Sequence, residues 1–142
     1  MGYSVFMESV QRSFRLSAVT SSLLDSLAET SNESRNSLVE RLLAEALRTE
    51  RHPLIGFHQG AAGRREPLII GTRLLVRQVV PLAREDGIEP TAQELGITPR
   101  QVQAAVGYYA DFGEDIDADA EWATRVEDEE HARWERERAL TA

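Results

Sequence analysis

The sequence contains no cysteine, which excludes disulfide bonds, zinc ribbons and thiol catalysis. Aromatic residues are also few, at 6% of 142 residues, while 42% of the residues are hydrophobic. This balance favours small helical units over one large sandwich core. No hydrophobic run approaches the roughly 18 residues of a membrane span, and the N-terminal residues lack the charged start and long apolar core of a signal peptide. We expect a soluble cytoplasmic protein that does not contact a membrane.

The residues that usually carry catalysis or bind metals lack the necessary spacing. His52, His58 and His131 are scattered and form no HExxH-like pattern. The "GTR" at residues 71–73 is not part of a Walker sequence, so nucleotide hydrolysis has no support. The alternating acids that begin at Asp115 lack the glycine and the final glutamate of a calcium loop. The sequence therefore predicts neither an enzyme nor a bound metal or cofactor.

The net charge of -8 is unevenly distributed along the chain. Residues 1–52 have six arginines against seven acids, residues 53–112 have six against six, and residues 113–142 have four against eleven. The acidity therefore belongs to the last segment. The first two segments are near neutral and can each present a locally basic face, so DNA binding is not excluded.

The stretch "SFRLS" alternates between polar and apolar residues, which is typical of a β-strand. Phe14 and Leu16 would lie on one face, and Ser13, Arg15 and Ser17 on the other. Helical patterns follow the stretch directly, so a hairpin partner within the chain is not available until well beyond it. We therefore expect the partner strand to come from a second copy of the chain.

Two amphipathic helices are predicted after this strand. Leucine and valine residues that recur every three or four positions indicate helices over residues 18–29 and 35–49. Ser34 is the candidate cap of the second helix, with Ser37 and Glu40 as an alternative capping box. The first fifty residues are thus expected to form a strand followed by two helices.

This order, with "FRLS", "LLDSLAE" and "SRNSLVERLLAEAL" over residues 13–48, resembles the ribbon-helix-helix family of DNA-binding proteins. The resemblance implies a homodimer whose paired strands lie in the major groove, with Arg15 able to make a bidentate contact with guanine. Backbone N–H groups at the start of the second helix would hold a phosphate. A solvated Arg15 and an ordinary apolar core remain the alternative. The implied DNA contacts are Ser13, Arg15, Ser17, Ser34, Arg35 and Asn36.

Residues 53–112 predict a β-hairpin and three helices. Short strands at residues 54–57 and 68–70 flank the loop "HQGAAGRR". A helix over residues 75–85 follows, then a short helix that starts at about Pro90 or Thr91.

The start of the third helix carries several helix signals. Thr98 is a candidate cap, Pro99 suits the first helical position, and Gln101 completes a capping box. Gly96 is expected to form the tight turn of a helix-turn-helix.

The pieces "IGTRLLVRQVV" and "AQELGITPRQVQAAVGYYAD" resemble a small domain of unknown function with a "GTRxxV" signature. The resemblance implies a relation to VapB-type antitoxins, which are paired with PIN-domain ribonuclease toxins. The start of the third helix offers a second candidate DNA contact through Arg100, Gln101 and Gln103. A purely structural or dimer-forming role is the alternative, because an apolar face follows. That face consists of Val102, Ala105, Val106 and Tyr109.

Residues 113–142 are rich in charge and cannot bury enough apolar surface to fold alone. Large apolar side chains such as Trp122 and Trp134 within a charged segment are typical of a segment that becomes ordered when it binds a partner. By the VapB resemblance this segment would lie across the toxin, with Arg125 as the first candidate to reach the acidic metal site of the ribonuclease. The alternative is a solvated helix packed on its own domain through the tryptophans. The candidate toxin contacts are Trp122, Arg125, Val126, Arg133, Trp134 and Arg136.

Together these observations predict a mainly α protein: a ribbon-helix-helix dimer over residues 1–52, a β-hairpin with a three-helix, helix-turn-helix-like domain over 53–112, and an acidic toxin-binding tail over 113–142. The expected function is an antitoxin that neutralises a PIN-domain ribonuclease and binds operator DNA to regulate its own operon. A stand-alone dimeric regulator and an interaction protein that does not bind DNA are the alternatives.

Overall fold

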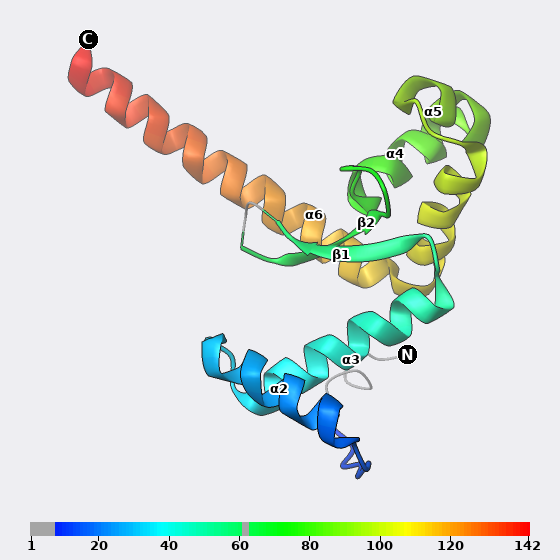
Figure 1. Cartoon of the computed structure of the whole chain (residues 1–142). Coiled ribbons are helices and arrows are strands. Elements are labelled where there is room, and N and C mark those ends of the chain that lie inside the picture. The colour runs from blue at the N-terminus through cyan, green and yellow to red at the C-terminus, as the bar shows by residue number, and fades with distance from the viewer. Residues whose placement is uncertain (1–7, 61–62) are drawn as a thin grey trace. The chain divides into compact units, whose positions relative to one another are not determined.

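The computed structural model describes residues 8–60 and 63–142, which form five helices and one two-stranded sheet (Figure 1). The predicted mainly helical fold with a small β-hairpin is confirmed. No helix in the described part of the chain is both long and apolar enough to cross a membrane. In chain order the elements are α2 (Ala18–Thr30), α3 (Arg35–Arg51), β1 (Ile55–Gln59), β2 (Arg65–Ile69), α4 (Val76–Asp86), α5 (Ile88–Leu95) and α6 (Pro99–Thr141).

The chain divides into two compact units, Met1–Leu42 and Leu43–Ala142, which we call unit 1 and unit 2. The division falls inside α3, whereas the sequence placed the first boundary after residue 52. The reason is that the second half of α3 makes its side-chain contacts with elements of unit 2. One of these contacts is the hydrogen bond from the Thr49 hydroxyl to the Ile55 carbonyl, at 2.9 Å.

Unit 1 contains α2 and the first part of α3, and both helices begin at a serine cap. The Ser17 hydroxyl accepts a hydrogen bond from the Thr20 N–H at 3.2 Å, and the Ser34 hydroxyl accepts one from the Ser37 N–H at 3.1 Å. Ser34 is therefore the cap, as the sequence indicated, in preference to the alternative box at Ser37. No residue of α2 is buried.

The predicted strand at residues 13–17 forms no regular secondary structure in the single chain. A strand needs a hydrogen-bonded neighbour, and the expected neighbour belongs to a second copy. The ribbon therefore stays a prediction.

The hairpin of unit 2 pairs β1 with β2 in antiparallel register, with Ile55 opposite Ile69 and Phe57 opposite Pro67. The predicted hairpin is confirmed, although its strands extend further into the loop than the sequence indicated. Pro67 offers no N–H to the ladder, which is tolerated because each strand of a two-stranded sheet is an edge strand.

The helix signals around Gly96 and Thr98 act as predicted. Gly96 ends α5 in the left-handed conformation, with φ 70° and ψ 33°, where glycine has no steric penalty. The Thr98 hydroxyl accepts the Gln101 N–H at 3.1 Å, and the Gln101 side-chain oxygen accepts the Thr98 N–H at 2.8 Å. This reciprocal pair is the predicted capping box, and Pro99 opens α6.

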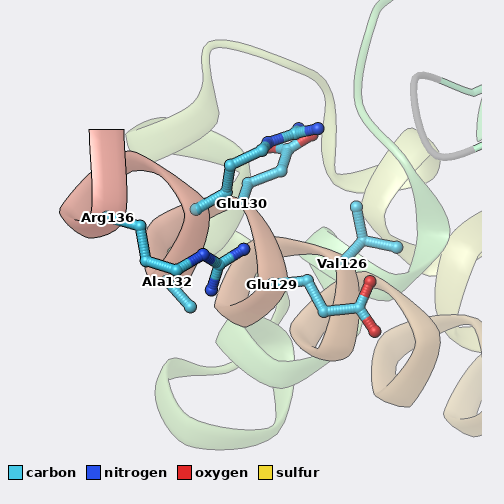
Figure 2. Close-up of a pocket in the computed structure, with 6 residues that line it drawn as sticks. Val126, Glu129, Glu130, Ala132 and Arg136 are labelled. Carbon is cyan, nitrogen blue, oxygen red and sulfur yellow. The ribbon is translucent and has the colours of Figure 1, made fainter. Parts of the chain in front are cut away.

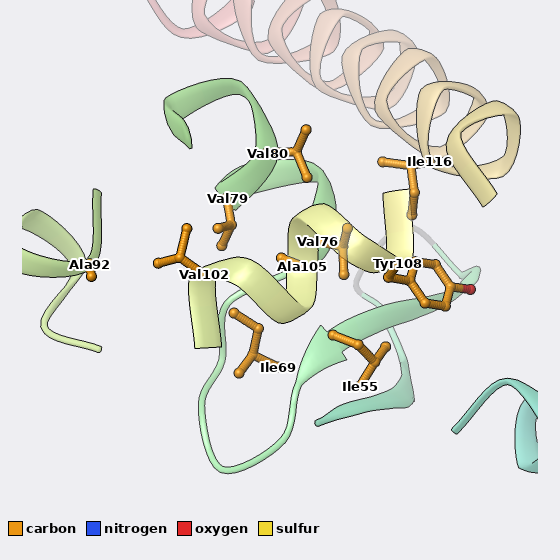
Figure 3. Packing of buried hydrophobic residues seen from close by; sticks show 10 residues of the cluster. All are labelled: Ile55, Ile69, Val76, Val79, Val80, Ala92, Val102, Ala105, Tyr108 and Ile116. Atoms are coloured by element: carbon orange, nitrogen blue, oxygen red, sulfur yellow. The ribbon is translucent and has the colours of Figure 1, made fainter. Parts of the chain in front are cut away.

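The core of unit 2 lies between the hairpin, α4, α5 and α6 (Figure 3). In the first turns of α6 the buried residues are Val102, Ala105 and Tyr108, with Tyr108 only 1% exposed. Two residues of the predicted apolar face, Val102 and Ala105, are thus buried, whereas Tyr109 is half-buried at the edge of the core. The buried cluster consists of Ile55, Ile69, Val76, Val79, Val80, Ala92, Val102, Ala105, Tyr108 and Ile116.

Helix α6 continues for 43 residues, through the point where the sequence indicated a separate tail. Its backbone departs from helical geometry at Phe112, with φ -130° and ψ 34°. After this kink, Ile116 and Asp119 are buried, at 3% and 7% exposure, so the first turns of the acidic segment pack on unit 2. Figure 1 shows the last turns of α6, in orange and red, extending beyond the other elements of unit 2.

Candidate nucleic-acid interface and protein-binding helix

The predicted base-reading stretch is exposed in the single chain. Phe14 and Leu16 are 71% and 54% exposed, although both are large and apolar. Arg15 is exposed, and among the described residues it has neither a hydrogen bond nor an ion pair. Ser17 also has a structural task, because its hydroxyl caps α2. In this stretch the Arg15 guanidinium is therefore free within the described part of the chain, and it neighbours the exposed apolar side chains of Phe14 and Leu16.

The predicted phosphate site lies at the start of α3. Helix geometry leaves the first backbone N–H groups without intrahelical partners, and their partial positive charge favours an anion. Arg35 is held by an ion pair with Asp25 at 2.5 Å, while Asn36 is exposed. The Ser34 hydroxyl is occupied by its cap hydrogen bond. Backbone groups, rather than the Arg35 side chain, are the better candidates for phosphate contact.

The second candidate DNA contact, at the start of α6, is only partly available. The Gln101 side chain is committed to the capping box, so its carboxamide oxygen already accepts a hydrogen bond. Arg100 and Gln103 are exposed. Two of the three predicted residues therefore point to solvent, and the third has a structural role.

A polar junction joins the end of α3 to α6 within unit 2, and sequence reasoning missed it. Arg48 donates hydrogen bonds to the Tyr108 hydroxyl at 3.0 Å and to the Asp115 carboxylate at 2.8 Å. Its guanidinium also lies 4.1 Å from the centre of the Phe112 ring, at the kink. Burial raises the pKa of Tyr108, which keeps the phenol neutral and able to accept from Arg48.

His52 strengthens the same junction. Its Nε2 lies 2.7 Å from an Asp111 carboxylate oxygen, and its ring meets the Tyr108 ring edge-on at 5.3 Å. These partners are about sixty residues apart in sequence, so no local pattern could indicate them. The described residues contain no group of three or more histidines and acids that could hold a metal ion.

A second polar cluster fixes the start of the exposed part of α6. Arg64, from the hairpin loop, forms an ion pair with Asp119 at 3.1 Å, and its guanidinium lies 5.7 Å from the Trp122 ring. Burial raises the pKa of Asp119 to about 6, against the opposing effect of the Arg64 charge. Trp122 is half-buried and also lies 5.4 Å from Arg125. Trp122 therefore contacts its own domain, as one of the sequence alternatives held.

The other predicted toxin contacts lie on different sides of α6. Trp134 is 50% exposed, with the His131 ring stacked on it at 6.0 Å and the Arg138 guanidinium at 5.2 Å. Val126, Arg133 and Arg136 line a shallow hollow on another side of the helix (Figure 2). Every lining residue belongs to α6, so the hollow has no second wall and suits a protein partner better than a small molecule.

Comparison of the chain with models of protein families, with curated proteins and with solved structures gives no match. The resemblances seen in the sequence therefore remain expectations. Function has to be argued from the surfaces described above.

Proposed function

We propose that this protein is a homodimeric, DNA-binding antitoxin. In this proposal unit 1 binds operator DNA, and the exposed part of α6 binds and neutralises a PIN-domain ribonuclease. Repression and neutralisation would be coupled because both surfaces belong to one chain.

The observation that carries the proposal is the uncovered apolar surface of unit 1. Val19, Leu23 and Leu27 recur on one face of α2 and are 71%, 66% and 43% exposed, next to the exposed Phe14 and Leu16. Burying one such side chain is worth about 1.5 to 3 kcal/mol, so a face of this kind favours a partner. A second copy would cover the face and supply the missing strand at the same time.

The polar residues support DNA as the ligand of that dimer. In a ribbon, alternation would place Arg15 on the face opposite Phe14 and Leu16, where a guanidinium can read guanine. The free N–H groups at the start of α3 would hold the adjacent phosphate. The acidity of the chain is no obstacle, because most of it lies in residues 113–142.

The exposed part of α6 supports the second half of the proposal. Every residue from 127 to 142 is exposed, and the segment combines Trp134 with several arginines. Exposed aromatic and arginine side chains are the residues that most often anchor protein interfaces.

Binding to the DNA upstream of the protein's own gene, measured by fluorescence anisotropy at several salt concentrations, tests the proposal. We expect selective, salt-dependent binding that Arg15→Ala abolishes. Arg12→Ala is the matched control, because Arg12 is also exposed but precedes the predicted strand. It should lower affinity uniformly at most and leave selectivity intact.

Absence of selective binding by the intact protein at low salt would contradict the DNA-binding half. A shortened chain that ends at residue 120 keeps unit 1 and should still bind DNA. Failure of this shortened chain to bind would contradict the assignment of binding to unit 1. Inhibition of a PIN-domain ribonuclease encoded beside the gene, retained by Arg15→Ala and lost in that shortened chain, would support the antitoxin half.

A further inference from the structure

The exposed part of α6 carries a stripe of residues that continues the buried side of the same helix. Ile116 and Asp119 are buried in unit 2, and the positions that follow at alternating steps of four and three lie on the same side. Positions with this repeat form the seam of a coiled coil and are usually apolar, whereas Glu130, Arg133 and Glu137 are charged here. The stripe consists of Ala123, Val126, Glu130, Arg133, Glu137 and Leu140.

The stripe has a self-complementary order of charges. Glu130 and Arg133 lie at its centre, and Ala123 and Leu140 lie near its ends, with Leu140 86% exposed. If a second stripe runs in the opposite direction, Glu130 meets Arg133 of the second copy, and Arg133 meets its Glu130. The same register places Leu140 on Ala123 and Glu137 on Val126 of the second copy.

We propose that a second copy of this chain pairs with this stripe, so that the ends of two α6 helices form a short antiparallel coiled coil. A two-fold axis would pass between residues 131 and 132. Each contact then occurs twice, as an isologous interface requires. This pairing is separate from the ribbon of unit 1 and does not depend on DNA binding. It covers Arg133 and Arg136, which the proposed function gives to the toxin, so the second copy and a toxin would compete for the end of α6.

The residues beside the stripe fit the same register. In antiparallel coiled coils the flanking positions face their counterparts across the seam, which brings Glu129 opposite Arg136 of the second copy. On the other flank, Trp134 lies opposite Glu127 of the second copy. Glu129, Glu130, Arg133 and Arg136 all line the hollow of Figure 2, which is where the axis would pass.

The charges also select the direction of pairing. A parallel pair in register would place Glu130 against Glu130, Arg133 against Arg133 and Glu137 against Glu137. Like charges at facing positions are unfavourable, while opposite charges fix orientation. The central ion pairs would thus specify the antiparallel arrangement at some cost in stability, as polar seam positions commonly do.

The preformed helix lowers the cost of this association. Nucleation is the expensive step of helix formation, and the first part of α6 is already held in the core by Val102, Ala105 and Tyr108. The ion pair of Arg64 with Asp119 and its contact with the Trp122 ring hold the base of the exposed segment. The second copy therefore meets an ordered helix rather than an unfolded tail.

Cysteine cross-linking tests the register, because this chain has no cysteine of its own. Ala123→Cys protein and Leu140→Cys protein, made with tags of different mass, are oxidised separately and as a mixture. We expect a disulfide between the two variants in the mixture and none within either alone. In the antiparallel pair, residue 123 of one copy lies about 25 Å from residue 123 of the other, by the helical rise.

A disulfide within each variant alone would show parallel pairing and overturn the proposal. No disulfide in the mixture would also overturn it. Both variants leave the sequence of unit 1 unchanged, so this result is independent of whether the protein binds DNA.

Charge exchange tests the central contact in the same cross-linking mixture. Glu130→Arg alone should abolish the cross-link by placing arginines together, and the double change Glu130→Arg with Arg133→Glu should restore it. Asp128→Arg is the matched control, because it changes the net charge equally on the outer side of α6 and should leave the cross-link unchanged. Equal loss in the control, or no rescue by the double change, would contradict the proposed pairing.

Discussion

The two units of the chain use their apolar residues in opposite ways. Unit 2 buries ten residues in one cluster between the hairpin and three helices, and it is supported by polar contacts such as Arg48 with Tyr108 and Asp115. Helix α2 of unit 1 has a leucine-rich face and not one buried residue. Unit 2 therefore has a hydrophobic core of its own, whereas the apolar face of α2 in unit 1 is the surface that we propose a second copy covers.

A similar contrast exists within α6. Up to Trp122 the helix is held by packing in the core and by the contacts of Arg64 with Asp119 and Trp122. Beyond residue 126 every side chain is exposed. The exposed surfaces of α2 and of the end of α6 are thus the two places where we propose that the protein binds other molecules.

The largest effect should come from removing the aromatic centre of unit 2. Tyr108→Ala removes a side chain that is 1% exposed and also leaves Arg48 without one of its acceptors. Truncation of a buried aromatic costs about 3 to 5 kcal/mol. Denaturant unfolding should show this loss, and Tyr108→Phe should lose only about 1 kcal/mol, because it removes the hydroxyl alone. Equal losses for the two variants would contradict this account of the core.

A change on α2 should affect association rather than the fold of unit 2. Leu23→Ser alters a side chain that is 66% exposed in the single chain. If a second copy buries the exposed two thirds of Leu23, each copy loses about 1 to 2 kcal/mol, and the symmetric dimer loses this twice. Dimerisation should therefore weaken by about 2 to 4 kcal/mol, or roughly 30- to 1,000-fold in Kd. Sedimentation equilibrium measures this change. An unchanged dimer would remove the contrast between the units.

The capping box should contribute less than the core. Thr98→Ala removes the acceptor for the Gln101 N–H at the start of α6 and should cost about 1 kcal/mol. Thermal or denaturant unfolding of unit 2 measures the loss. Thr124→Ala, which changes an exposed threonine inside the same helix, is the matched control and should have almost no effect.

A pH dependence of stability is expected at the base of the exposed helix. Burial raises the pKa of Asp119 from 3.8 to about 6, so the folded protein binds a proton more tightly than the unfolded chain does. The contribution of Asp119 to stability should therefore fall as the pH rises from about 4 to about 6. Asp119→Asn should flatten the pH profile of unfolding in that window. An identical profile for both proteins would show that Asp119 does not titrate there.

Local signals in the sequence were sufficient for most element boundaries. Thr98, Pro99 and Gln101 predicted the start of α6, and Gly96 predicted the turn before it, because caps and turns depend on residues close together in the chain. Ser34 likewise predicted the start of α3.

Contacts between distant residues could not be predicted in this way. The acidic segment from residue 113 was expected to need a partner in order to fold, yet its first turns pack through Ile116 and Asp119. The ion pair of Asp119 depends on where the hairpin places Arg64, and no local pattern encodes this position. The same holds for Arg48 with Tyr108. DNA contact by Arg15 and toxin contact by the end of α6 stay predictions.

Amide hydrogen exchange of residues 13–17 tests most directly the claim that a second copy completes unit 1. In the single chain these residues form no regular structure, so their amides should exchange freely. The account predicts protection of alternate amides at high protein concentration, as in a paired antiparallel ribbon, and its loss on dilution below the dimer Kd. Free exchange at every concentration would contradict the ribbon and, with it, the proposed mode of DNA binding.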